Sequence, residues 1–238
     1  RQTERLTAAV KEVLAVSSGD VRFIAADLTE SEAPEKIHNW CKAQGIKVNM
    51  LINNAGVTGT MPFENSSGEY LHSMIMVNIR ALTLLTRLFI DDMKAYKEAK
   101  IVNIGSMSGF LPIPYKGVYA ATKAYVHSFT GSLREELKGT GIEVYLSAPN
   151  GVTSNPLVSE RIESHKKIGR LVSLTPERYA VMLLDNIERG NKFHIPLCAN
   201  RLLYWISRLM PDSLIARLMK KEFRKEFGSQ DLEVDLRK

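Results

Sequence analysis

Tyr119 and Lys123 stand four residues apart, with Ser106 thirteen residues upstream, and these residue types could carry out proton transfer. A free tyrosine has a pKa near ~10, so it needs a nearby cation to give up its proton at neutral pH. On a helix, residues at i and i+4 share one face, so the Lys123 ammonium can stabilise a developing Tyr119 phenolate. The spacing therefore predicts a proton-transfer site.

The spacing alone is not specific, because Tyr96 and Lys100 repeat it and Thr83 stands thirteen residues before Tyr96. The Thr83 hydroxyl falls inside one amphipathic run, 70–97, where no strand ends. Ser106 instead follows an apolar run of strand length, and ligands bind outside the carboxyl ends of strands in open α/β sheets. We therefore expect function at the second tyrosine–lysine pair and none at the first.

Three further stretches surround the pair. The strand expected at 48–52 runs into Asn53-Asn54-Ala55-Gly56, where small residues let a backbone approach a ligand and amides can tie neighbouring strands together. Asn78 lies in the long helix expected before Ser106. The strand expected at 142–147 runs into a loop that reads Pro149-Asn150-Gly151-Val152-Thr153-Ser154.

With these motifs in this order, the sequence resembles the short-chain dehydrogenase/reductase family over most of its length. Within the family it is most similar to the branch of hydroxysteroid dehydrogenase-like and fatty-acyl reductases. Helices and strands alternate along the chain without repeats or low-complexity linkers, which predicts a parallel sheet covered on both faces. The resemblance implies an α/β fold, a Rossmann-like doubly wound parallel sheet, as a single domain with a C-terminal helical extension. We expect the domain at 1–199 and the extension at 200–238.

The resemblance implies hydride transfer between a nicotinamide cofactor and a carbonyl or secondary alcohol. Tyr119 would be the general acid in reduction and the general base in oxidation, and Ser106 would hydrogen-bond the substrate oxygen. Lys123 would lower the pKa of Tyr119 and bind the nicotinamide ribose. Asn78 would place a water in a proton relay to the lysine.

The resemblance also implies a set of cofactor contacts. Asp27 matches a family aspartate near the adenine ring, although it could equally cap the helix expected near Ser31. In the loop after 142–147, Asn150 stands where the family has glycine and Ser154 where it has threonine. The full expected set of cofactor contacts is Asp27, Leu28, Asn54, Ala55, Gly56, Tyr119, Lys123, Pro149, Gly151, Val152 and Ser154.

The family's glycine-rich phosphate-binding loop does not occur in the sequence, because no glycine precedes Gly19. We therefore expect a first strand, loop, helix and second strand to lie before Arg1. In the family's strand order these two strands separate the strand expected at 21–26 from the one expected at 48–52, by roughly 14 Å. Arg1 would lie near the adenosine 2′-phosphate of NADP, so we favour NADP over NAD.

Composition limits the remaining choices. The sequence has 238 residues, a net charge of +6 and two cysteines, Cys41 and Cys198, without metal or redox spacing. No run of some 18 uninterrupted apolar residues occurs, which with the cysteines favours a cytoplasmic protein. The five histidines, His127 and His165 among them, show no metal-ligand spacing, so we expect no metal site and assign them no role. The charge is modest and no recognition motif occurs, so we expect no nucleic-acid partner.

The segment 201–227 is apolar and basic, and Pro211 with Asp212 predicts two helices rather than one. Three interpretations compete. The first is a helical pair packed on its own core or on a second subunit. In the second, the pair and the loop 155–173 cover an apolar substrate. The third, less favoured, is peripheral attachment to an anionic membrane surface, which the need to bury the apolar face weakens.

Two other functions compete with the enzyme. One is a non-catalytic regulatory protein that keeps the fold and the cofactor site. The other is an extended-family enzyme acting on nucleotide sugars, for which the chain leaves little room for a separate substrate domain. The resemblance further implies a homodimer or homotetramer, because helices flanking Asn78 and Tyr119 build dimers in the family.

Overall fold

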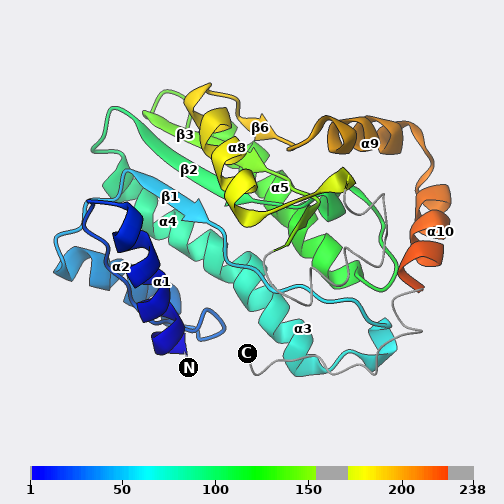
Figure 1. Ribbon diagram of the computed structural model, residues 1–238, viewed down its shortest axis with the longest axis horizontal. Helices are drawn as coiled ribbons and strands as arrows, with labels where there is room; N and C mark the ends of the chain where they lie inside the picture. Colours follow the sequence, from blue (N-terminus) through cyan, green and yellow to red (C-terminus); the bar gives the residue numbers. More distant parts are fainter. Residues whose placement is uncertain (1, 154–170, 225–238) are drawn as a thin grey trace.

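A parallel sheet organises the chain, in a computed structural model that describes residues 2–153 and 171–224. Its strands are β1 (Met50–Asn53), β2 (Ala99–Ile104), β3 (Ile142–Ser147) and β6 (Phe193–His194), adjacent in that order (Figure 1). All three pairings are parallel, and Ile101 of β2 stands opposite Val144 of β3. The predicted α/β class and parallel sheet are therefore confirmed.

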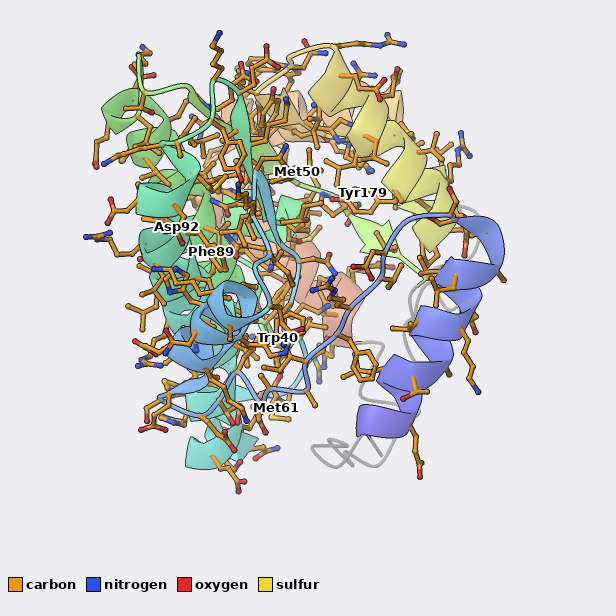
Figure 2. All side chains as sticks on the ribbon, turned by 90° about the vertical axis from the view of Figure 1, so that its left-hand side faces the viewer. Trp40, Met50, Met61, Phe89, Asp92 and Tyr179 are labelled. Atoms are coloured by element: carbon orange, nitrogen blue, oxygen red, sulfur yellow. The ribbon has the colours of Figure 1, made fainter. Side chains whose placement is uncertain are left out.

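Helices cover both faces of the sheet. On one face, Ile101 and Val144 pack against Phe89 of α4 (Leu82–Met93) and Leu133 of α5 (Gly117–Glu136). The next residues along the two strands, among them Val102, point to the other face and pack against α8 (Pro176–Glu188). Figure 2 shows Phe89 and Tyr179, from α4 and α8, on opposite sides of the sheet. This alternation gives strands buried on both faces, and explains their nearly continuous apolar sequence.

One long helix runs through 68–93 in three parts, α3 (Gly68–Ile75), the π-helical segment η2 (Met76–Ala81) and α4. The run 68–93 is long and apolar enough to cross a membrane by length and composition. Here it lies along the sheet, and its buried Thr86 accepts a hydrogen bond from Asn53 of β1. Packing in the core therefore accounts for part of its apolar character, since Phe89, Ile90 and Met93 are buried there.

The strand expected at 21–26 is not formed: these residues make no ladder with any described strand. In the family's strand order its partner is not β1 but a strand lying between them, so no neighbour stands within hydrogen-bonding distance. The helices on either side are α1 (Gln2–Val16) and α2 (Ala33–Ala43). The helix expected near Ser31 is α2, which begins two residues after Ser31.

Smaller elements complete the sheet's carboxyl edge. They are the 3-10 helices η1 (Phe63–Asn65) and η3 (Met107–Phe110), and the short strands β4 (Gly151–Val152) and β5 (Ser173–Leu174), which pair in parallel. The loop expected to cover a substrate, 155–173, lies mostly outside the described residues.

The C-terminal segment forms two helices, as predicted, α9 (Cys198–Leu209) and α10 (Asp212–Phe223). Pro211 is the N-cap of α10, one position earlier than the first helical residue, and its fixed φ starts the helix cleanly. Both helices lie at the end of the molecule opposite α1 and α2 (Figure 1). The division of the chain at residue 199 stays a prediction, and α9 begins at Cys198.

Candidate active site at the carboxyl edge of the sheet

Ser106 stands at the end of β2, where the chain leaves the sheet. It is buried and is the N-cap of η3, with its Oγ accepting a hydrogen bond from the Ser108 N–H at 3.1 Å. The Met107 N–H donates to the Pro149 carbonyl at 2.9 Å, so the exit from β3 holds this loop in place. The serine hydroxyl is thus fixed between two strand ends, where ligands bind in open α/β sheets.

Lys123 reaches the same place from α5. Its Nζ donates to the Ile104 carbonyl at 2.8 Å and lies 6.0 Å from the centre of the Tyr119 ring. The Lys123 side chain is only 5% exposed, and this burial lowers the pKa of its ammonium to about 8. The predicted grouping of Ser106, Tyr119 and Lys123 is therefore present in space.

The pKa of Tyr119 departs from expectation, since it is raised rather than lowered. Burial of the phenol is the largest cause, and hydrogen bonds with Ser106 and Thr58 only partly oppose it. Desolvation disfavours the phenolate more than these neighbours stabilise it. The phenol is consequently protonated at neutral pH, in the state that can donate a proton.

Asn78 lies in the π-helical segment and is 1% exposed. Its Oδ1 accepts from the Val57 N–H at 2.7 Å, while its Nδ2 donates to the Val57 carbonyl at 2.9 Å and to Thr122 Oγ1 at 3.0 Å. The side chain thus clamps the segment after β1 to α5. The water relay expected of Asn78 stays a prediction.

The turn after β1 divides between core and surface. Asn53 is buried, whereas Asn54, Ala55 and Gly56 are exposed. A Cβ added to Gly56 would lie 3.4 Å from Asn78 Oδ1 and 3.5 Å from Lys123 Nζ, so this backbone passes directly over the site. A ligand lying along the turn would therefore be next to the Lys123 ammonium.

A buried polar chain ties the strands beneath the site together. Asn53 Nδ2 donates to Asn103 Oδ1 at 2.8 Å, and Asn103 Nδ2 donates to Thr130 Oγ1 at 3.0 Å. The chain links β1, β2 and α5, as expected for an amide of the Asn53 turn. Sequence reasoning missed Asn103 and Thr130, although a lone amide inside an apolar strand was a usable signal.

His127 is the residue whose contribution was missed most clearly, because it was assigned no role. Its Nε2 accepts a hydrogen bond from the Ser106 N–H at 3.3 Å, and its ring packs on Phe110 with the ring centres 4.2 Å apart. A Cβ at Gly105 or Gly109 would come within 2.4 Å or 2.5 Å of the imidazole. Burial and the Lys123 charge lower the pKa of His127 to about 4, so the ring stays neutral and can accept.

The other expected cofactor residues are placed less decisively. Asp27 Oδ1 accepts from the Thr29 N–H and hydroxyl, which lowers the Asp27 pKa, so this carboxylate closes its own turn. It does not cap α2, whose N-cap is Glu32. Leu28 follows in the same turn and is half-buried. Their contact with adenine stays a prediction.

In the loop after β3, Pro149 is buried, and Gly151 and Val152 form β4. Asn150 does not have a positive φ, so its backbone conformation does not require the glycine that the family has there. The exposed Asn150 side chain instead donates to Asn200 Oδ1 at 3.3 Å. Ser154 lies outside the described residues.

The first tyrosine–lysine pair is separated in space by its secondary structure. Tyr96 lies in a bend after α4 and Lys100 lies in β2, so they do not share a helix face. Thr83, at the matching distance upstream, hydrogen-bonds Tyr125 within the helical layer. The expectation that the strand end distinguishes the two pairs agrees with this geometry.

The site suits a nicotinamide nucleotide better than a metal. Lys123 Nζ has three donors but one acceptor, the Ile104 carbonyl, among the described residues, which leaves capacity for ribose hydroxyls. The exposed backbone of 54–56 offers a surface beside it. Within residues 2–153 and 171–224, no group of three or more histidine, cysteine or acidic side chains could hold a metal ion.

The fold is that of a parallel α/β protein with polar side chains gathered at the carboxyl edge of its sheet, and comparison with known proteins gives its family. The family model for short chain dehydrogenases matches residues 1–165. The chain is 32% identical over 184 residues to the NADP-dependent 3-hydroxy acid dehydrogenase YdfG of Escherichia coli, covering 74% of this chain and 72% of that protein. This chain belongs to the short-chain dehydrogenase/reductase family, as its motifs predicted.

Other relatives agree with the expected branch. The chain is 28% identical to the very-long-chain 3-oxoacyl-CoA reductase-A of Danio rerio over 195 residues, which are 79% of this chain and 57% of that protein. It therefore spans little more than half the length of that relative. Among solved structures, the fold matches a 7β-hydroxysteroid dehydrogenase at 20% identity with a TM-score of 0.79, covering 91% of this chain and 83% of that one.

Proposed function

We propose that the protein is an NAD(P)-dependent oxidoreductase that interconverts a carbonyl and a secondary alcohol. The observation that carries this proposal is the convergence of Ser106, Tyr119 and Lys123 where β2 ends, beside the exposed turn 54–56. Each of these three side chains is held by the fold rather than by a flexible loop tip. This preorganisation is what proton transfer to a developing alkoxide requires.

In reduction, Tyr119 donates its phenolic proton to the substrate oxygen while Ser106 Oγ hydrogen-bonds the same oxygen. The raised pKa of Tyr119 keeps that proton in place until negative charge develops nearby. Lys123 stabilises the phenolate that is left and holds the nucleotide ribose. A bound nicotinamide supplies or accepts the hydride, and oxidation uses the same groups in reverse.

NADP is the favoured cofactor and NAD is the alternative. The E. coli relative is named NADP-dependent. A short-chain oxidoreductase solved with NADP is 32% identical to this chain with a TM-score of 0.57, over 61% of this chain and 65% of that one. The basic position expected beside the 2′-phosphate, Arg1, lies outside the described residues.

The substrate class we propose is an apolar ketone or alcohol. Aromatic contacts that join the C-terminal helices to the region around Ser106 support it. Phe110, in the loop that carries Ser106, packs edge-on against Tyr204 of α9, with ring centres 4.8 Å apart. Lys116, which precedes α5, lies with its Nζ 4.8 Å from the centre of the Phe223 ring of α10. The C-terminal helices thus border the site with apolar surface.

The oligomeric state and the cellular location remain predictions from the sequence. We propose a homodimer or homotetramer in the cytoplasm. Light scattering on the purified protein measures the first, and fractionation of cells expressing it measures the second. A monomer by light scattering would contradict the assembly part of this proposal without touching the chemistry.

The experiment that tests the function measures NADPH and NADH oxidation against a panel of apolar ketones. We expect NADPH-dependent turnover that Ser106→Ala reduces by about 100-fold, because one preorganised hydrogen bond to the oxyanion is lost. Ser128→Ala, which removes an exposed hydroxyl elsewhere on α5, is the matched control. Equal turnover by both variants would contradict the proposal.

The competing candidate is a regulatory protein that binds nucleotide without turning over. That candidate predicts nucleotide binding with no ketone reduced by the wild-type protein. The ketone panel therefore separates the two functions directly.

A further inference from the structure

Helix α9 is strongly amphipathic, and it lies with its apolar side outward. Asn200 is buried, and its Nδ2 donates to the carbonyls of Val172 and Pro196. Tyr204, one turn later, packs on Phe110 and Phe193. The helix is therefore attached to the molecule through its polar and tyrosine-bearing side.

The opposite side of α9 carries large apolar residues in contact with solvent. Leu202, Trp205 and Leu209 are 62%, 65% and 87% exposed, and Ile206 between them is also exposed. These positions follow the spacing i, i+3, i+4 and i+7, which places them on one helix face. Soluble proteins bury such a stripe unless it meets a partner.

Basic residues border this face. Arg201 and Arg208 lie within one turn of Trp205 on α9, and on α10 Leu214 and Leu218 are also exposed, within one turn of Arg217 and Lys221. The described part of the two helices, 198–224, holds six basic residues against two acidic ones, a net charge of +4 out of +6 for the chain. The basic residues are Arg201, Arg208, Arg217, Lys220, Lys221 and Arg224.

We propose that the exposed face of α9 and α10 docks on an anionic lipid surface. Burial of the apolar stripe at the headgroup boundary and attraction of the basic border to acidic lipids act together there. The interpretation that the helices pack on their own core does not fit the exposure of this stripe. A second copy of the chain fits less well than a membrane, because it would bring two basic borders together.

The position of the face supports this choice. It lies at the end of the molecule away from β1 and α1 (Figure 1), so a strand added to the outer edge of β1, which has no partner among the described residues, would not cover it. Tyr204 joins the docking helix to Phe110 of the Ser106 loop. Docking would thus bring the candidate active site close to the lipid surface without any change of fold.

The test is flotation of the protein with vesicles of phosphatidylcholine alone and of phosphatidylcholine with phosphatidylserine. We expect binding to the acidic vesicles that weakens when salt rises from about 0.1 M to about 1 M, as the screening length shortens. Leu209→Glu should lower the bound-to-free ratio by at least about tenfold, through lost apolar burial and added repulsion. Val181→Glu, which changes a 69% exposed apolar residue on α8, should bind like wild type.

The basic border is tested in the same way with Arg208→Glu, and Lys47→Glu before β1 is its control. In a Trp40→Phe background, Trp205 emission should shift to shorter wavelength on acidic vesicles only. Equal binding by wild type and Leu209→Glu overturns the proposal, and so does equal binding to both vesicle types. Absence of vesicle binding, with a dimer that Leu209→Glu dissociates, also overturns it by assigning the face to a second copy.

Discussion

Lys123 shows at the level of one residue how burial and chemistry are coupled. Its ammonium lies under the Asn53 turn with the Ile104 carbonyl as acceptor, and its pKa falls to about 8 because water is excluded. The same exclusion raises the pKa of Tyr119. Burial thus shifts both groups toward their neutral forms: Tyr119 keeps the proton that it must donate, while Lys123, with a pKa of about 8, is still mostly protonated at pH 7 and can stabilise the phenolate.

The lowered pKa of Lys123 predicts a pH dependence of stability. Between pH ~8 and the unfolded value of ~10.4, the unfolded chain binds more protons than the folded one, so the free energy of unfolding rises with pH. Across that window the contribution is about 3 kcal/mol. For Lys123→Met, the free energy of unfolding measured with urea should not rise across this window. At pH 7 it should be higher than that of the wild-type protein.

Lys97→Met, which removes an exposed ammonium after α4, should keep the wild-type slope. The same slope in Lys123→Met as in wild type would show that the buried lysine is not its source.

His127 is expected to act as a positioning residue for Ser106. His127→Leu removes the acceptor of the Ser106 N–H and should lower kcat by about tenfold, while NADPH affinity stays near wild type. His127→Gln can place an oxygen near the position of Nε2 and should recover most of kcat. Steady-state kinetics with a ketone that the wild-type protein reduces measures kcat for both variants. Equal losses of kcat in the two variants would refute the positioning role.

At the scale of elements, the contact between η3 and α5 sets the site. His127 fits beneath the Ser106 loop only because Gly105 and Gly109 lack side chains. The Gly109 backbone comes so close to α5 that an added Cβ would lie 2.7 Å from the Lys123 carbonyl carbon. Glycine at this position is therefore required by helix packing rather than by an unusual φ.

Gly109→Ala should destabilise the protein by about 1–3 kcal/mol, because the backbone of α5 must move. At Gly131, which lies in α5 itself, an added Cβ would have nothing within 4 Å, so Gly131→Ala is the comparison variant. It should stabilise by about 0.5–1 kcal/mol through helix propensity. Thermal unfolding of the two variants compares them, and similar melting temperatures would contradict this account of the loop.

Much of this element order could be predicted from the sequence. Strand 142–147 and the two C-terminal helices follow from apolar runs and from Pro211, and Ser106 follows from the strand before it. The π-helical turn at Asn78 and the hydrogen bond of His127 could not, because both depend on contacts between segments distant in sequence. The strand expected at 21–26 failed for a related reason, since a strand needs a neighbour as well as a pattern.

At the scale of the whole molecule, two surfaces lie at opposite ends. The free edge of β1 exposes Met50 and Ile52 at one end, and the outward face of α9 lies at the other (Figure 1). The candidate active site lies between them at the carboxyl edge of the sheet. Leu209 on the outward face of α9 makes no contact with the site residues named above, so docking and chemistry can be tested by separate variants although Tyr204 connects the two regions.

The most direct test of the central claim is the rate of single-turnover ketone reduction by Tyr119→Phe. NADPH binding by the same variant is measured as well, and Tyr96→Phe is the control. The proton donor is lost in the first variant only, so its rate should fall by at least about 100-fold. Its NADPH affinity should stay within about threefold of wild type. Tyr96→Phe should react like wild type. Undiminished turnover by Tyr119→Phe would contradict the assignment of this tyrosine as the general acid.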